Sequence, residues 1–433
     1  MALVRKKMMD AKKKMRYTPY DILIFLTIMF QGAKQLRIFP TPFYKYFIAL
    51  LFVLLFLKYI REKRSFKISK AFAALLVVVI SFSFIVTPTT KTIVPAIFFV
   101  IELLAFRMYL GIFDTRKAFF ERLLSIILLS ATALSIFGFI QIIGYNLHIN
   151  FLYDFKWLGF VPNYYGYLGE GRFYSIYDEP AHLCTILGAG LFAGFYFFKK
   201  CKNIKYIFAL LAIAVFALET GSVITYLSVI IFVIFSFLYN YHFLGQKISP
   251  KVILVLIMFF VTAASFAVAK PSLISNSMDK IDNFFSDNID NVNSQNLTTF
   301  ALKSNYLIAK KKINDGYIFG TGIFTHESYY YSYIDLVYEK HYQRYLNYTD
   351  AASIFIRLLS EFGILSMVIF LAIIAYIIRS YFKKDYIGTF LILLFITQSM
   401  RLGDYTWILT CLPVVAILSR EKTGSTKAIG GKK

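Results

Sequence analysis

The sequence predicts an all-α protein that crosses a membrane many times. Of its 433 residues, 58% are hydrophobic, and the mean hydropathy is +0.62. Apolar runs of about 18 to 22 residues recur along the chain, close to the length that one helix needs to cross a bilayer. A soluble protein with buried helices has fewer and shorter runs, so a polytopic membrane protein is the expected class.

The apolar runs predict twelve membrane spans. The expected spans are 19–36, 42–60, 70–87, 93–113, 121–144, 180–198, 205–219, 221–239, 251–270, 351–378, 386–402 and 404–418.

The basic residues predict the orientation of these spans. The chain has 47 Lys and Arg against 24 Asp and Glu, a formal net charge of +23. With the N-terminus inside, clusters such as "KYIREKRSFKISK" and "KKCKNIK" all fall on one side, as cytoplasmic loops should. The clusters are divided among separate loops, which favours membrane lipid over nucleic acid as a partner.

This topology divides the chain into five parts, with both termini in the cytoplasm. The two long segments outside the membrane are too long to be simple connectors, and long loops without strong periodicity are usually functional or disordered. The parts are a basic arm at 1–18, nine spans at 19–270 with an outer loop at 145–179, a large outer loop at 271–350, three spans at 351–418, and a tail at 419–433.

The large outer loop ends in a segment rich in tyrosine. The stretch "GYIFGTGIFTHESYYYSYIDLVYEKHYQRYLNYTD" holds nine of them. Aromatic rings stack on the apolar faces of sugars, so this composition suits a glycan groove. Tyrosine also anchors proteins at the membrane interface, and the sequence leaves both interpretations open.

Charged residues at the outer ends of the expected spans are candidates for function, because a charge near a bilayer is costly unless it is paired or hydrated. The stretch "GRFYSIYDEPAHL" places four such groups in a dozen positions. Pro180 suits the first helical position, which puts Glu179 near the N-cap. Glu179 is then either a capping carboxylate with Arg172 as a surface partner, or a functional group beside His182.

Three further stretches agree with a functional interpretation. They are "LETGSVITYL" with Ser222, "GYIFGTGIF" with Gly320 and Gly322, and "LLSEFGILSMVIFL" with Glu361 and Gly363. Together with an Arg–Ser–x–x–x–Glu–Pro pattern, their order resembles Wzy-type O-antigen polymerases over roughly residues 120–410. The pattern is matched by Arg172, Ser175, Glu179 and Pro180.

The chain also departs from this family and from the related O-antigen ligases. The ligases carry a His–Asn pair before the Glu–x–Gly–Ile span, where this chain has Ala352 and Ser353. Val223 replaces the arginine that usually follows the serine of the Thr–Gly–Ser segment, and Lys303 stands where many members carry an arginine.

The resemblance implies a GT-C-like polymerase/ligase architecture in a bacterial inner membrane, with the large loop in the periplasm. The implied substrate is an undecaprenyl-pyrophosphate-linked oligosaccharide, which the enzyme polymerises on the outer face of the membrane. No cofactor, metal or nucleic acid is expected. Membrane lipid, a chain-length regulator and a flippase are the further partners that it implies.

Site roles follow from this resemblance and from charge. Arg172, Arg357 and Arg401 are candidates for neutralising the pyrophosphate, with Lys303 and Tyr348 as additional substrate contacts. Glu179 leads as general base, followed by Asp350, His182 and His326. Arg357 has a second interpretation as the ion-pair partner of Glu361, and Asp350 has one as a helix N-cap. Supporting roles are expected for Pro180, Ser222, Gly320, Gly322, Glu361 and Gly363.

Two other functions remain open at this point. An O-antigen ligase shares the donor but normally has the histidine that is missing here. A polysaccharide flippase or transporter has a comparable number of spans, but it should carry polar groups near the membrane midplane and short loops.

Overall fold

The structure is a computed structural model of the whole chain. It describes residues 17–33, 36–38, 41–83, 89–162, 165–246, 297–337 and 346–419, with 257, 268, 271, 275 and 278 as isolated positions. The basic arm at 1–16, the expected ninth span at 251–270 apart from two positions, and the tail at 420–433 lie outside the described residues.

The described chain is mostly helical, as predicted for an all-α membrane protein. A two-stranded antiparallel sheet, β1 (Arg37–Ile38) and β2 (Thr41–Pro42), is the only sheet in these ranges. The first helices are α2 (Pro19–Gln31), α3 (Tyr44–Arg61), α4 (Lys70–Ser81), α5 (Thr90–Leu110), α6 (Arg116–Asn146) and α7 (Asn150–Tyr153). Those that follow are α8 (Cys184–Cys201), α9 (Lys205–Glu219), α10 (Val223–Leu238), α13 (Leu297–Asn314), α14 (His326–Val337), α15 (Ile354–Phe362), α16 (Leu365–Phe382), α17 (Tyr386–Ser399) and α18 (Ile408–Leu418).

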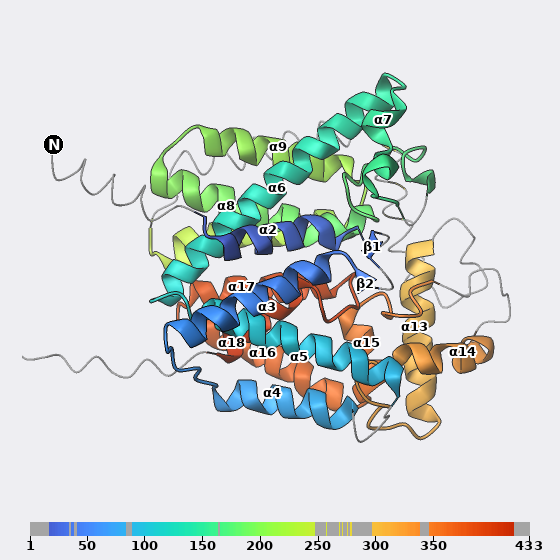
Figure 1. Ribbon diagram of the computed structural model, residues 1–433. Coiled ribbons are helices and arrows are strands. Elements are labelled where there is room, and N and C mark those ends of the chain that lie inside the picture. The colour runs from blue at the N-terminus through green and yellow to red at the C-terminus, as the bar shows by residue number, and fades with distance from the viewer. Residues whose placement is uncertain are drawn as a thin grey trace, which may run out of the picture.

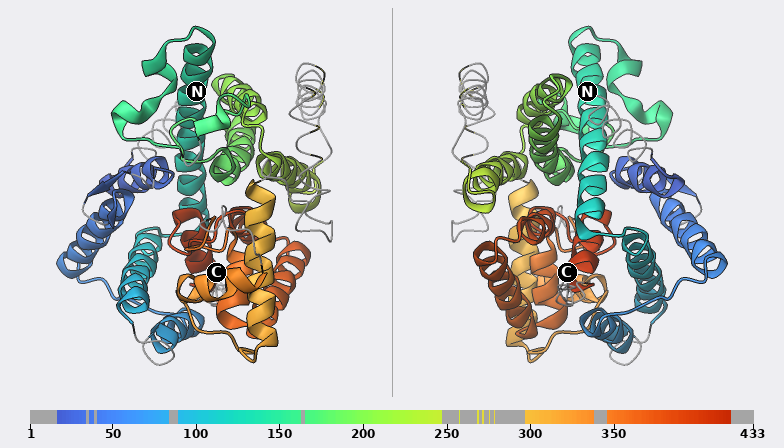
Figure 2. Two further views of the ribbon diagram at one scale, coloured as in Figure 1. Left: turned by 90° about the vertical axis from the view of Figure 1, so that its right-hand side faces the viewer. Right: turned by 90° about the vertical axis from the view of Figure 1, so that its left-hand side faces the viewer.

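The axes of most of these helices are roughly aligned, and the helices form a bundle (Figure 1). Helix α13 crosses one end of the bundle, with α14 beside it, and Figure 2 shows this end facing the viewer on the left. In that view α2 to α5 form an arc along one side. The segments between α6 and α8, and between α17 and α18, reach the same end, which we call the α13 end.

Five helices are long and apolar enough to cross a membrane: α5, α6, the span that begins at Pro180 and continues through α8, α10 with its π-helical extension to Phe243, and α16. Four apolar helices, α2, α4, α17 and α18, have between 11 and 14 residues, short of the roughly 20 that one complete crossing needs. The span through α8 is 94% buried, whereas α16 is 11% buried, so α8 is central and α16 peripheral.

The continuous span expected at 351–378 is wrong, because the structure divides this stretch into α15 and α16. Gly363 separates them and adopts φ +53° with ψ −131°, which is not helical. A Cβ at this position would overlap the backbone of Ile318. Helix α15 is therefore a short segment at the α13 end, and only α16 is long enough to span a membrane.

Candidate functional site

Glu179 lies where the chain enters the central span. Its backbone is extended, at φ −149° and ψ 138°, and Pro180 begins a short 3-10 helix over Pro180–Leu183 that leads into α8. The proline fixes its own φ and keeps the preceding residue extended. Glu179 occupies the N-cap position, but its side chain makes no capping hydrogen bond. Its carboxylate is therefore available for another partner.

That partner is Arg401, in the loop between α17 and α18. Its Nη2 donates to both Glu179 oxygens, at 2.7 and 3.0 Å, and its Nε donates to Oε1 at 3.1 Å. The two residues are 4% and 3% exposed, so water screens this pair only weakly. Burial raises the pKa of Glu179, but the Arg401, His182 and Arg172 charges outweigh it and lower that pKa to about 2. Glu179 is ionised at neutral pH.

His182 lies one turn further along and forms a dyad with Asp178. Its Nδ1 is 2.5 Å from Asp178 Oδ1, and its Nε2 is 3.5 Å from Glu179 Oε2. His182 Nε2 makes no hydrogen bond within the described residues. A histidine oriented by a carboxylate through Nδ1, with Nε2 available, is the usual arrangement for proton transfer. Sequence reasoning gave Asp178 no role in this arrangement.

The turn at Tyr174 and Ser175, which precedes Asp178 in the chain, is held against α6 by Gln141. The Gln141 side-chain oxygen accepts hydrogen bonds from the backbone N–H groups of Tyr174 and Ser175, at 3.0 and 2.9 Å. Ser175 adopts a left-handed φ of +56°, and its hydroxyl donates to the Leu134 carbonyl oxygen at 2.8 Å. Gln141 and Ser175 are both completely buried. Gln141 lies in the middle of an apolar run, and an isolated polar residue there was the one available signal for this role.

Arg172 lies close enough to Glu179 to influence its ionisation. Its guanidinium lies over the Tyr167 ring, 4.9 Å from the centroid, and its Nη1 is 3.5 Å from Glu170. Its Nε is buried and makes no hydrogen bond to any described residue. Arg172 is 8% exposed, and a buried guanidinium with an unused donor is suited to bind an anion.

A second buried ion pair joins Arg357 to Glu361, as the four-residue spacing allowed. Arg357 Nε donates to Glu361 Oε1 at 2.9 Å, and Arg357 Nη1 donates to the Gly403 carbonyl oxygen at 2.9 Å. The Tyr405 hydroxyl donates to Glu361 Oε2 at 3.0 Å, and its ring lies 4.6 Å from the Arg357 guanidinium. Tyr405 completes the pair, a role that sequence reasoning did not assign.

The two ion pairs belong to one layer, because the segments at 350–354 and 399–403 run side by side. Ile354 N donates to Leu402 O at 2.9 Å, and Arg401 Nη1 donates to Ala352 O at 3.3 Å. Asp350 contributes electrostatically to Arg401. Its carboxylate accepts from Ala352 N at 3.1 Å, and Ser353 is the N-cap of α15. Asp350 therefore shapes the turn before α15 and does not cap that helix.

The Gly–x–Gly stretch with Gly320 and Gly322 connects the large loop to the end of α15 through backbone hydrogen bonds. The backbone N–H groups of Thr321 and Gly322 both donate to Glu361 O, at 3.0 and 2.9 Å, and Ile364 N donates to Ile318 O at 2.8 Å. Gly320 has φ +77°, and a Cβ there would overlap the Glu361 backbone. Only glycine allows this approach without strain.

A chain of hydrogen bonds continues from α15 into the large loop. Lys312 Nζ donates to Ser360 Oγ at 3.0 Å and to Thr321 Oγ1 at 2.9 Å, and Ser360 Oγ lies 2.9 Å from His326 Nδ1. His326 Nε2 lies 2.9 Å from Asn305 Oδ1, and the Asn305 amide N–H groups donate to two carbonyls.

This series of hydrogen bonds determines which ring nitrogen of His326 carries the proton. Asn305 Oδ1 must accept, so the proton of His326 is on Nε2, and Nδ1 accepts from Ser360. Burial together with the charges of Lys312 and Arg357 lowers the pKa of His326 well below its ordinary value. Burial lowers the pKa of Lys312 to about 8, against the opposing effect of Glu361. His326 therefore holds the loop in place and is not in contact with Glu179.

The remaining predicted site residues lie at the margins of this layer. Tyr348 packs against the rings of Tyr330 and Tyr331 from α14, with centroids 6.1 and 5.5 Å away. Lys303 lies on α13 and is half-buried. Ser222 is buried at the N-cap of α10, where Ser222 O accepts from Tyr226 N. Within the described part of the chain, no three His, Cys, Asp or Glu side chains are grouped so as to hold a metal ion.

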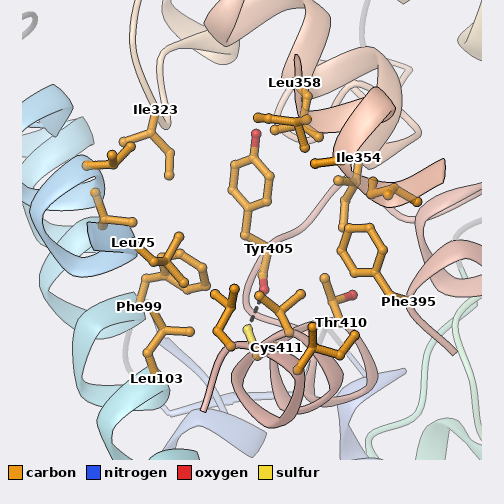
Figure 3. Close-up of a pocket in the computed structure, with 18 of the residues that line it drawn as sticks. Leu75, Phe99, Leu103, Ile323, Ile354, Leu358, Phe395, Tyr405, Thr410 and Cys411 are labelled. Carbon is orange, nitrogen blue, oxygen red and sulfur yellow. Dashed lines mark hydrogen bonds between the residues drawn. The ribbon is translucent and has the colours of Figure 1, made fainter. Parts of the chain in front are cut away.

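An apolar cavity of about 400 Å³ is lined in part by Tyr405, the residue that contacts both members of the Arg357–Glu361 pair. Tyr405 lines it, and in Figure 3 its ring stands between Ile323 on one side and Ile354 and Leu358 on the other. Helices α4, α5, α15, α16, α17 and α18 supply the rest of the wall, which is almost entirely hydrocarbon. The cavity therefore provides a space for an apolar chain next to the charged layer.

The arrangement brings together residues from four separate stretches of the sequence. It contains two guanidinium–carboxylate pairs, a third buried arginine and an Asp–His dyad. Such a site can bind a polyanion next to an apolar chain and can accept a proton. Comparisons with models of protein families, with curated proteins and with solved structures gave no significant match, so the chain is assigned here to no family.

Proposed function

We propose that this protein is a membrane glycosyltransferase that polymerises lipid-linked oligosaccharide repeats, as Wzy-type O-antigen polymerases do. The donor is a growing glycan on undecaprenyl pyrophosphate, and the acceptor is a new lipid-linked repeat. The protein lies in the inner membrane of a bacterium, and the α13 end faces the periplasm.

One observation carries this proposal. The stretches that resemble the polymerases, far apart in the sequence, meet in one layer at the α13 end. Glu179 from the Arg–Ser–x–x–x–Glu–Pro stretch pairs with Arg401. Phe173 N in the same stretch donates to the carbonyl of Glu219, at the start of the Thr–Gly–Ser stretch, at 3.1 Å. The Gly–x–Gly stretch binds the backbone of Glu361.

The proposed reaction forms one glycosidic bond and breaks one. The acceptor hydroxyl oxygen attacks the anomeric carbon of the growing glycan. The bond from that carbon to the pyrophosphate oxygen breaks, and undecaprenyl pyrophosphate leaves with the electron pair. The hydroxyl proton passes to a base, and the leaving group needs cations that stabilise its developing charge.

Arg172 and Arg357 are the proposed ligands of the pyrophosphate. Arg172 has a buried donor that no described residue uses, and Arg357 contacts Tyr405, which lines the apolar cavity. A guanidinium binds phosphate oxygens with two parallel hydrogen bonds, which suits a leaving group that gains charge. Arg401 is assigned to orient Glu179, because its Nε and Nη2 already donate hydrogen bonds to that carboxylate.

His182 is the proposed general base, in place of Glu179. A carboxylate with a pKa of about 2 that accepts from a guanidinium at both oxygens is a weak proton acceptor. His182 has an unused Nε2 and an orienting carboxylate, Asp178. Glu179 then stabilises the imidazolium that forms, since its Oε2 lies 3.5 Å from Nε2.

The apolar cavity is the proposed site for the first isoprenoid units of the donor. Its lining is almost entirely hydrocarbon and includes Tyr405, which contacts Arg357. A lipid chain there would place its pyrophosphate next to the guanidinium. The charged groups of the layer are buried, so donor binding requires them to become accessible through a rearrangement at the α13 end.

A deletion strain tests this function. Without the protein, lipid-linked glycan should accumulate as single repeats, and a plasmid copy should restore the longer polymers. Arg357→Ala should fail to restore them at equal protein level, whereas Arg379→Ala, on α16 and outside the layer, should restore them. Long polymers in the deletion strain would refute the proposal.

A further inference from the structure

The opposite end of the bundle holds a second cavity with polar groups. Helix α5 ends there at Leu110, α6 begins at Arg116, and α18 ends at Leu418. The cavity between them has a volume of about 410 Å³. One part of its wall is apolar and the other is polar. The lining residues used below are Arg107, Asp114, Arg116 and Ser419.

Three of these residues have buried polar atoms without a hydrogen-bond partner in the described ranges. They are Arg107 Nε, Arg116 Nε and Nη2, and Ser419 Oγ. Each guanidinium is held through another nitrogen: Arg107 Nη2 donates to Lys67 O at 2.5 Å, and Arg116 Nη1 lies 2.8 Å from both carboxylate oxygens of Asp385. Buried donors that remain unused are rare in proteins and point to a ligand or water.

The charge of this cavity favours an anion. Arg107 and Arg116 line it, and Asp385 neutralises only one of the two. Asp114, the acidic residue of the lining, is exposed at its rim. A ligand with phosphate oxygens toward the arginines and hydroxyl groups toward Asp114 satisfies both.

An apolar groove begins on the other side of Arg107. A neighbouring cavity of about 460 Å³ is lined by Lys63 and Arg64 at its polar end and by Phe52, Phe56 and Ile60 from α3. These three α3 residues are four positions apart and lie on one helix face. The Arg107 guanidinium lies 5.9 Å from the ring of Phe66, which lines this cavity, and Arg64 Nη1 donates to Gly111 O, whose residue lines the first. The two cavities are therefore adjacent.

We propose that these two cavities form a binding site for an anionic phospholipid of the cytoplasmic leaflet. The phosphate lies between Arg107, Arg116 and Ser419, and an acyl chain lies along the Phe52–Phe56–Ile60 face. Lipid is preferred over a soluble phosphate ester because the groove continues as hydrocarbon along α3, where Phe56, Leu57 and Ile60 are exposed apolar side chains. The basic loops of this end agree with a cytoplasmic position. The site is independent of the proposed glycosyl transfer.

Native mass spectrometry of the purified full-length protein tests this site. Phosphatidylglycerol should bind more tightly than phosphatidylcholine, whose choline cation the arginines repel. Arg107→Gln should weaken phosphatidylglycerol binding about tenfold or more, as expected for a lost charged hydrogen bond. Ser419→Ala, which removes no charge, should weaken it by a smaller factor. Lys383→Gln is the matched control, because this exposed lysine lies at the same end and lines neither cavity.

Any one of three results would overturn the proposal. Equal binding of the two lipids, or an equal effect of Arg107→Gln and Lys383→Gln, would show that general surface charge attracts the lipid. Displacement of phosphatidylglycerol by excess soluble glycerol phosphate would assign the cavity to a soluble phosphate ester. Resistance to that excess, with loss of binding in Arg107→Gln, is the expected outcome.

Discussion

Arg401 donates hydrogen bonds from two of its nitrogens to the Glu179 carboxylate, although the two residues are 222 positions apart in the chain. The pair links the beginning of the central span to the loop between α17 and α18, and both partners are buried. Neither residue can be changed alone without leaving a buried charge. A loss of activity in a Glu179 variant can therefore result from lower stability as well as from a change in the chemistry.

Removing one partner of this pair should destabilise the protein strongly. Glu179→Gln leaves the Arg401 guanidinium buried without its counter-charge, which typically costs about 3–5 kcal/mol. The double change Glu179→Gln with Arg401→Gln removes both charges and should recover much of that loss. Thermal unfolding in detergent measures both. Glu170→Gln, at an exposed carboxylate, is the control, and a single variant as stable as this control would contradict the account.

The Glu179 pair also predicts how stability depends on acidity. The pKa of Glu179 is about 2 in the folded protein and 4.5 ordinarily, so the unfolded chain binds its proton first. The stabilisation is complete above about pH 4.5 and is lost as the pH falls toward 2. The double variant lacks the pair, so its stability should fall less over this range. Parallel curves for the two proteins would show that Glu179 titrates normally.

His182 should control the rate of the reaction more than the binding of the donor. His182→Gln keeps a polar side chain next to Asp178 but cannot accept a proton, so turnover should fall by about a hundredfold or more. The concentration of lipid-linked donor that gives half-maximal rate should change little. Steady-state assays on reconstituted protein separate the two parameters. An unchanged turnover would move the search for the base to Asp350.

Gly320 should tolerate no side chain. Its φ of +77° disfavours any L-residue, and a Cβ would overlap the Glu361 backbone. Gly320→Ala should destabilise the contact between the large loop and α15 by about 1–3 kcal/mol, the usual range for strained backbone. Gly316→Ala is a matched control, because Gly316 also has positive φ, at +102°, but open space around it. Limited proteolysis of the loop would detect the difference, and equal protection in both variants would count against the contact.

The Lys312–Ser360–His326 chain predicts a second dependence on pH. His326 has a folded pKa below its ordinary 6.5, so the unfolded state binds a proton first and stability should fall as the pH decreases below about 6.5. The pKa of Lys312 is about 8, below its ordinary 10.5, so stability should rise between about pH 8 and 10.5. His326→Gln should abolish the first slope, and the exposed His148→Asn should leave it unchanged. A slope that persists in His326→Gln would assign it to other groups.

The sequence predicted the long apolar helices well, because a run of about 20 apolar residues leaves few alternatives. Helices α5, α6, α8, α9 and α10 lie within a few residues of the expected spans. The break at Gly363 was missed, because hydropathy alone does not separate one long span from a short helix followed by a span. The positive φ at that glycine follows from its contact with Ile318, which is a tertiary property.

Only part of the site's membership was predictable from the sequence. Glu179, Arg357 and Arg401 stood out because charges near a bilayer are costly, but charge alone could not pair Glu179 with Arg401. The left-handed turn at Ser175 and its attachment to Gln141 depend on a contact across 34 positions. The weak basicity of Glu179 depends mainly on Arg401, which lies 222 positions away along the chain, so no local pattern indicated that His182 is the better base.

The most direct test is the conversion of purified lipid-linked repeats by the purified protein in liposomes. The account predicts a ladder of glycans that differ by one repeat on a single undecaprenyl pyrophosphate, with one free undecaprenyl pyrophosphate released for each repeat added. Arg172→Ala, folded and at equal amount, should slow this release on the order of a hundred- to a thousandfold, as for the loss of one oriented donor. Arg172→Lys should recover only part of it. Single repeats that remain unchanged in the presence of folded wild-type protein would contradict the account.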